Sequence, residues 1–227
     1  MADNNILQYE STVWKTADLL IASGIKQSDF PKFMMPFFAL IMVESRFVRM
    51  IEEVKSEFVE NNYDLNLLFE EIKDLNQGYN KFLVEKNKTL KDLCRSDKTF
   101  EIDFDAYLKG FDDETKDLLG VEKGNEEEKY LDISGICGLL KKKRILLAFT
   151  KAWSEIDLKP FNNSEITTLE EHIKRKWADI SAETSGEQYT PDDVINLISE
   201  IVASKITDKN GIITIYDPTC GGGNMLF

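Results

Sequence analysis

A glycine-rich turn after a short apolar run limits the fold of this chain more than any other segment. The run Ile212-Ile213-Thr214-Ile215-Tyr216 is rich in β-branched and aromatic residues, which favour a buried β-strand. Asp217-Pro218-Thr219-Cys220-Gly221-Gly222-Gly223 follows directly. Glycine accepts positive φ and lets a ligand approach the backbone closely. In open α/β sheets, ligands bind beyond the carboxyl ends of the strands. We therefore expect an α/β domain to begin here, with a nucleotide-type ligand at the turn.

Three binding chemistries and one structural interpretation compete for this turn. A phosphate-binding P-loop requires Gly-Lys-Ser/Thr, but Asn224-Met225 follows Gly223. A dinucleotide site requires a third glycine where Leu226 stands, and an acid about 20 residues further on. The third chemistry is binding of S-adenosylmethionine (SAM), which the pattern Asp217-Pro218-x-x-Gly221-x-Gly223 fits without a gap. A plain strand-to-helix turn without a ligand remains open.

A second motif lies upstream of the turn, Gly186-Glu187-Gln188-Tyr189-Thr190-Pro191. Thr190 suits the N-cap of a helix, and Pro191 suits its first helical position. The residues that follow place apolar side chains on one helical face, at Val194, Leu197, Ile198, Ile201 and Val202. The order is thus a capped helix, a strand and the glycine turn.

The two motifs together resemble the modification (M) subunit of type I restriction-modification systems, a family of SAM-dependent adenine-N6 DNA methyltransferases. Val13–Asp18 is similar to the opening helix of that family's helical domain, and Ala152–Leu158 to a late segment of it. Two features depart from the family pattern. Gly222 stands where the family usually carries Ser or Thr. The catalytic Asn/Asp-Pro-Pro-Tyr/Phe tetrapeptide is absent, since these residues contain no Pro-Pro pair.

The resemblance implies SAM as the cofactor. A single histidine and the lack of a Cys-x-x-Cys pair argue against a metal site. Asp217 would face the methionine ammonium, Thr190 would be a polar contact, and the glycines would let the backbone close over the cofactor. The residues implied in cofactor binding are Glu187, Gln188, Tyr189, Thr190, Asp217, Pro218, Cys220, Gly221 and Gly223. No catalytic residue is assigned, and we expect these residues alone to be catalytically incomplete.

The implied partners are a specificity (S) subunit, a second M subunit, a restriction (R) subunit and double-stranded DNA, whose target adenine would be flipped out of the helix. The alternative from another class is a non-catalytic helical module that docks to other proteins. A NAD-dependent enzyme is a further reading, which the missing third glycine disfavours.

The composition restricts where such a protein acts. The net charge of −13 argues against DNA binding by these residues alone, because nonspecific affinity comes mostly from Lys and Arg. The run Lys141-Lys142-Lys143-Arg144 is the best local candidate for phosphate contact, with a solvated helix start as the simpler explanation. Three widely spaced cysteines and the absence of a long apolar segment favour a reducing cytoplasm and no membrane.

The expected fold class is mainly α. A helical N-terminal domain, residues 1–180, is followed by residues 181–227, the first helix and strand of an α/β SAM-dependent methyltransferase (Rossmann-like) domain. Apolar periodicity predicts helices over about 4–23, 30–60, 131–156 and 162–180, with shorter pieces between 63 and 95. Thr99–Phe104 alternates between polar and apolar residues, which predicts an extended segment or short edge strand.

Overall fold

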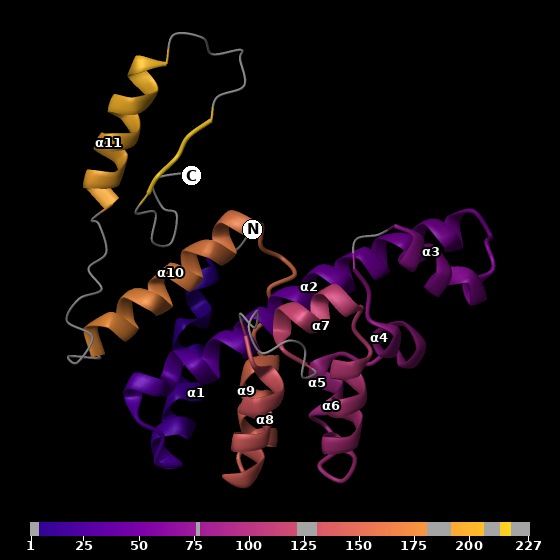
Figure 1. Cartoon of the computed structure of the whole chain (residues 1–227). Coiled ribbons are helices and arrows are strands. Elements are labelled where there is room, and N and C mark those ends of the chain that lie inside the picture. Colours follow the sequence, from indigo (N-terminus) through magenta and orange to yellow (C-terminus); the bar gives the residue numbers. More distant parts are fainter. Residues whose placement is uncertain (1–4, 76–77, 122–130, 181–191, 207–213, 219–227) are drawn as a thin grey trace. The chain divides into compact units, whose positions relative to one another are not determined.

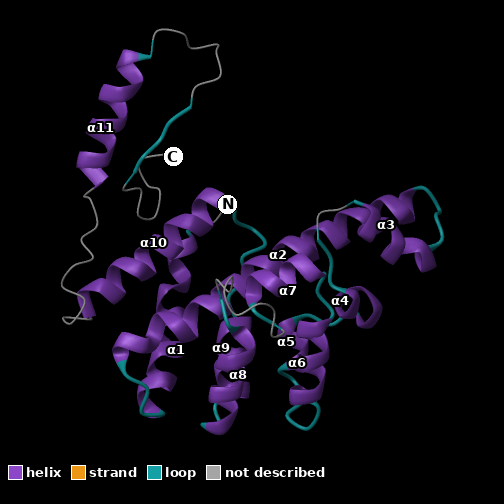
Figure 2. Cartoon of the chain, viewed as in Figure 1, coloured by secondary structure: helices purple, strands orange, loops and turns teal. Residues whose placement is uncertain are grey.

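A computed structural model describes residues 5–75, 78–121, 131–180, 192–206 and 214–218, and every regular element within these ranges is a helix (Figure 2). The helices are α1 (Glu10–Ala22), α2 (Phe30–Glu60), α3 (Leu68–Asp74), α4 (Lys81–Lys86), α5 (Leu90–Leu93), α6 (Phe100–Lys109), α7 (Asp113–Leu119), α8 (Ile133–Lys142), α9 (Leu146–Ser154), α10 (Asn163–Ile180) and α11 (Asp192–Lys205), with 3₁₀ turns η1 (Ile6–Tyr9), η2 (Gln27–Asp29) and η3 (Leu65–Leu67). No helix among these residues is long and apolar enough to cross a bilayer.

The described chain divides into two compact units, Met1–Leu169 and Glu170–Phe227. The first contains α1 to α9 and the beginning of α10; the second contains the rest of α10 and α11. The domain boundary expected at residue 180 stays a prediction, because residues 181–191 lie outside the described ranges.

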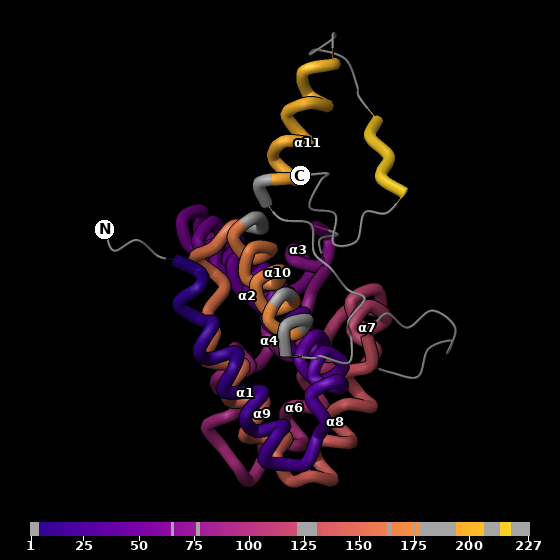
Figure 3. The backbone as a smooth tube through the Cα atoms, turned by 90° about the vertical axis from the view of Figure 1, so that its left-hand side faces the viewer, coloured from indigo at the N-terminus to yellow at the C-terminus, as the bar shows by residue number. Residues whose placement is uncertain are grey.

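Helix α2 is the central helix of the first unit, and most of the unit's other helices pack against it. Pro31 lies in its first turn, where the missing N–H removes no helical bond, and the helix then runs for 31 residues, or about 46 Å. Its apolar stripe is buried from Phe30 to Phe58, as its periodicity predicts. It packs against α1, α3, α7, α8 and α9, and the paths of these helices around it can be followed in Figures 1 and 3. The confirmed long helix therefore positions most of the unit.

The core beside α2 is aromatic. Phe37 of α2 meets the ring of Phe149 of α9 edge-on, with centroids 4.9 Å apart, and stacks against Phe104 of α6 at 6.4 Å. Trp153 of α9 packs edge-on against Phe38 at 6.3 Å. Edge-to-face and offset contacts of this kind add to the free energy that burial itself provides. The predicted helical region 131–156 is confirmed, as two helices rather than one.

Helix α10 begins at a side-chain cap formed by Asn162 and Glu165. The side chain of Asn162 accepts a hydrogen bond from the Glu165 N–H at 2.9 Å, and the Glu165 carboxylate accepts one from the Asn162 N–H at 2.8 Å. These two bonds satisfy backbone donors that a helix start leaves unpaired. The apolar residues Ile166, Leu169, Ile173 and Trp177 are buried at helical spacing, as the periodicity of residues 162–180 predicts.

The extended segment predicted for Thr99–Phe104 is wrong, because Phe100–Lys109 form α6. Phe100, Phe104, Tyr107 and Leu108 are buried at helical spacing, whereas Ile102, an inward residue in the alternating pattern, is 75% exposed. The alternation covered only six residues, and the spacing from Phe100 to Phe104 satisfies both periods. Tertiary burial of one helical face decided between them.

The strand predicted for residues 212–216 is not present in its described part. Thr214–Asp217 carry no regular structure and are drawn as loop in Figure 2, while Ile212 and Ile213 lie outside the described ranges. A strand is held by hydrogen bonds to a neighbouring strand. Among the described residues the single β-type pairing is an isolated bridge between Asn80 and Phe111, far from this segment in sequence. The Rossmann-like sheet therefore stays a prediction.

Candidate cofactor-binding site

The predicted cofactor-binding residues fall mostly outside the described ranges. Glu187, Gln188, Tyr189 and Thr190 lie in the segment 181–191, and Cys220, Gly221 and Gly223 lie in 219–227. Asp217 and Pro218 are described: Asp217 is partly buried, and Pro218 is exposed in a turn. The structure thus does not test whether the two motifs meet, and their assembly into one site stays a prediction.

Helix α11 confirms the helix predicted after the first motif. Its described part begins at Asp192, and Thr190 and Pro191 lie outside the described residues, so the cap at Thr190 stays a prediction. The motif residues themselves precede the described part of the helix. An N-terminal helix end presents unpaired N–H groups, and the chain directly before it is a common place for ligand contacts.

The predicted apolar face of α11 is exposed in the described structure. Ile195 is buried, but the five residues of that face are accessible: Val194, Leu197, Ile198, Ile201 and Val202. Ile215 and Tyr216, directly before Asp217, are accessible as well. A run of accessible apolar side chains on one helix marks a surface that another element or another molecule covers. This is the character expected of a helix that packs on a sheet.

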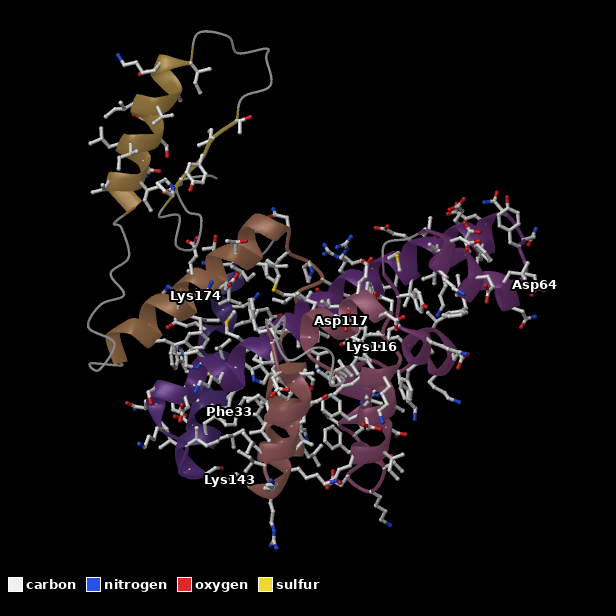
Figure 4. All side chains as sticks on the ribbon, viewed as in Figure 1. Phe33, Asp64, Lys116, Asp117, Lys143 and Lys174 are labelled. Carbon is white, nitrogen blue, oxygen red and sulfur yellow. The ribbon has the colours of Figure 1, made fainter. Side chains whose placement is uncertain are left out.

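The basic run Lys141–Arg144 lies at the end of α8 rather than at a helix start. Lys141 forms an ion pair with Glu101 of α6, with 2.5 Å between Nζ and Oε2. Lys143, labelled in Figure 4, donates a hydrogen bond to the Ser23 carbonyl at 2.8 Å. Cations near a helix C-terminus are favourable because that end carries a partial negative charge. The predicted helix start is therefore wrong, and Lys141 and Lys143 make contacts within the first unit at a helix end.

The thiols of the first unit are unsuited to nucleophilic chemistry. Cys94 and Cys137 are free. Burial raises the pKa of Cys94 to about 11 and that of Cys137 to about 12. Because the thiolate is the reactive form, both groups are unreactive near neutral pH.

The sequence interpretation missed a buried carboxyl group, that of Glu44 on α2. Its Oε2 atom accepts a hydrogen bond from the Tyr107 hydroxyl at 2.6 Å and another from the Leu90 N–H at 2.7 Å. Leu90 is the first residue of α5, and Tyr107 belongs to α6. One carboxyl group therefore joins three helices. The side chain as a whole keeps some accessible surface, but its carboxyl group is enclosed by protein.

Burial raises the pKa of Glu44 from 4.5 to about 7, although the two hydrogen bonds act in the opposite direction. The carboxylates of Asp92 and Asp157 add to the increase. Tyr107 is also buried, and its pKa lies well above its ordinary value. A signal for this group was present in the sequence: Glu44 interrupts the apolar stripe of α2 between Ile41 and Phe47, where a charged residue is unusual.

A comparison with protein families finds one for the C-terminal part of the chain. Residues 165–227 match the N-6 DNA Methylase family, a range that covers less than a third of the chain. No curated protein and no solved structure matches the chain. The matched range contains α11 and every residue predicted to bind the cofactor. This match relates residues 165–227 to the N-6 DNA methyltransferases.

Proposed function

We propose that this protein acts as the modification subunit of a type I restriction-modification system, a SAM-dependent methyltransferase of adenine N6 in double-stranded DNA. The observation that carries the proposal is the family match over residues 165–227. That range holds both Glu187-Gln188-Tyr189-Thr190 and the Asp217-Pro218-x-x-Gly221-x-Gly223 turn. The resemblance of Val13–Asp18 and Ala152–Leu158 to the helical domain of these subunits supports the narrower assignment.

The residue types fit the chemistry of SAM. Asp217 is partly buried at the end of the segment Thr214–Asp217. A carboxylate is a suitable partner for an ammonium group, because charge-assisted hydrogen bonds are stronger than neutral ones. Gly221 and Gly223 would let the backbone approach the cofactor without a Cβ.

In this proposal SAM supplies an activated methyl group. Asp217 and Thr190 orient the cofactor through its polar end, and Tyr189 offers an aromatic surface beside it. The adenine amino group is inaccessible inside the base stack, so the target nucleotide leaves the duplex before transfer. The acidic chain attracts DNA poorly by itself, since it carries 41 acidic and 28 basic residues. We therefore propose that a specificity subunit supplies sequence recognition, with a second M subunit and a restriction subunit in the complete assembly.

Asp217→Asn should weaken SAM binding by about ten- to a hundredfold. The substitution keeps the size of the side chain and removes its charge, and a hydrogen bond to a charged group contributes about 1.5–3 kcal/mol. Isothermal titration calorimetry of SAM into both proteins measures the difference. The control is Glu114→Gln, which removes one exposed carboxylate of α7 and should leave the affinity unchanged.

Equal affinity in the wild type and Asp217→Asn would contradict the role given to this carboxylate. A wild-type protein that binds no SAM would contradict the methyltransferase proposal for these residues. It would favour the alternative, a non-catalytic docking module built on the helical unit.

A further inference from the structure

The far end of α2 exposes apolar side chains that the core of the first unit does not use. Val59 is 65% exposed, Tyr63 is 56% exposed and Leu67, in η3, is 58% exposed. We name residues 57–71 the α2–α3 tip; they comprise the last turn of α2, η3 and the start of α3. Figure 4 labels Asp64, which lies in the α2–α3 tip.

The α2–α3 tip is held in a defined shape. The Tyr63 N–H donates to the Phe58 carbonyl at 2.8 Å, and the two rings meet edge-on with centroids 5.5 Å apart. Asp64 accepts hydrogen bonds from the backbone N–H and the side-chain amide of Asn66 at 2.9 and 2.8 Å. Asn62 has a φ of 55°, a conformation that asparagine adopts more readily than most residues. The exposed apolar groups thus sit on an ordered turn.

The charge of the tip is of one sign. Residues 57–71 contain five acidic residues and no Lys, Arg or His, and all five acids are exposed: Glu57, Glu60, Asp64, Glu70 and Glu71. The nearest lysine before the tip, Lys55, donates instead to the Asn87 side chain at 3.1 Å. Within the described ranges, the ion pairs do not include Glu57, Glu60 or Asp64.

Folding gives no reason for this placement of charge. The C-terminus of a helix carries partial negative charge and is stabilised by Lys or Arg. Helix α2 has no basic residue in its last turn and has Glu57 and Glu60 there. Native proteins tend to break such local rules at functional sites.

The acidic residues and the exposed apolar side chains of the tip together favour one class of partner. The five acids repel DNA phosphates. They also repel the same tip of a second copy, since like charges facing each other are unfavourable. Lysine and arginine side chains of another protein would be attracted, and its apolar side chains would cover Val59, Tyr63 and Leu67. Exposed aromatic and aliphatic groups with a charged rim are typical of protein interfaces.

We propose that the α2–α3 tip is a docking surface for a basic segment of a partner protein, with apolar contacts to Val59, Tyr63 and Leu67 and ion pairs to the acids of the same segment. This surface belongs to the first unit, outside the residues related to the methyltransferases.

The test measures binding of a fluorescein-labelled peptide of Leu and Lys, patterned as an amphipathic helix, by fluorescence anisotropy on the full chain. Two variants alter the tip: Val59→Ser/Tyr63→Ser/Leu67→Ser and Glu57→Gln/Glu60→Gln/Asp64→Asn. Two matched controls alter exposed residues elsewhere: Ile102→Ser/Leu118→Ser/Leu139→Ser and Asp97→Asn/Glu114→Gln/Asp117→Asn. Circular dichroism checks the fold of each, and the charge variant, which only exchanges isosteric side chains, carries the test if the apolar variant is unstable.

Both tip variants should weaken peptide binding at least about tenfold while both controls stay near the wild type, and binding should decline with added salt. Equal losses in tip variants and controls, or no binding to the wild type, would overturn the proposal. Equal affinity for a Leu–Glu peptide or a DNA duplex would also overturn it. Self-association that sedimentation shows to depend on the tip would assign the surface to a second copy and overturn the basic partner.

Discussion

Replacing Glu44 by Gln should make the helical unit more stable above pH 7, by up to about 3 kcal/mol, and should remove the pH dependence that this carboxyl group gives to its stability. The pKa of this carboxyl group is raised by burial from 4.5 to about 7, and each pKa unit corresponds to about 1.4 kcal/mol. Glutamine keeps the shape and a carbonyl oxygen that can accept from Tyr107 and Leu90. It is neutral at every pH.

The direction of the effect follows from the folded pKa lying above the unfolded one. The folded state binds the proton more tightly, so the stabilisation is fully present below pH 4.5 and is lost as the pH rises through about 7. Wild type and Glu44→Gln should therefore differ most above pH 7, where the variant is the more stable. The two unfolding free energies should converge toward pH 4.5.

Urea unfolding followed by circular dichroism at several pH values measures this difference. Glu53→Gln, on the exposed side of the same helix, is the control and should follow the wild-type curve. Parallel curves for wild type and Glu44→Gln would show that the enclosed carboxyl group has no raised pKa.

Gly120→Ala should destabilise the helical unit by about 2–5 kcal/mol. Gly120 follows the last residue of α7 with a φ of 68°, where a Cβ is strained by about 1–2 kcal/mol. A Cβ there would also overlap the backbone carbonyl of Leu131, which is not a flexible group that can move aside. Overpacking of that kind costs about 1–3 kcal/mol more. Thermal unfolding measures the loss.

The matched control is Gly138→Ala in the interior of α8. A Cβ at Gly138 meets nothing within 4 Å, so alanine should stabilise the protein by about 0.5–1 kcal/mol through its better helix propensity. A loss at Gly138 comparable to that at Gly120 would contradict the assignment of the effect to the αL conformation and the contact with Leu131.

Long apolar periodicity could be predicted from the sequence, whereas short alternation could not. The stripe of α2 repeats over about eight turns, so its period is unambiguous, and α10 adds a cap at Asn162 that fixes its start. Thr99–Phe104 offered six residues, too few to separate the two periods. Burial of Phe104 against Phe37, a contact between residues far apart in the sequence, then decided for the helix.

For the candidate site, the sequence predicts which residues take part but not how they are arranged in space. Its residues came from motif order at Tyr189-Thr190 and Asp217–Gly223, and the match to residues 165–227 supports the class of protein that those motifs indicate. Their spatial assembly stays a prediction, because residues 181–191 and 219–227 lie outside the described ranges and Thr214–Asp217 carry no regular structure. Glu44 was missed for a related reason, because its partners at Leu90 and Tyr107 are 46 and 63 residues away. Apolar periodicity shows which face of a helix is buried, but it does not show which residues that face contacts.

Photocrosslinking tests the central claim most directly, that the two motifs of the C-terminal part form one SAM site. The protein is irradiated with SAM carrying a tritiated methyl group, digested, and the labelled peptides are identified by mass spectrometry. The account predicts label in the peptides that contain Tyr189 or residues 217–223, and its loss when unlabelled SAM competes. Label confined to the helical unit, or label that unlabelled SAM does not displace, would contradict it.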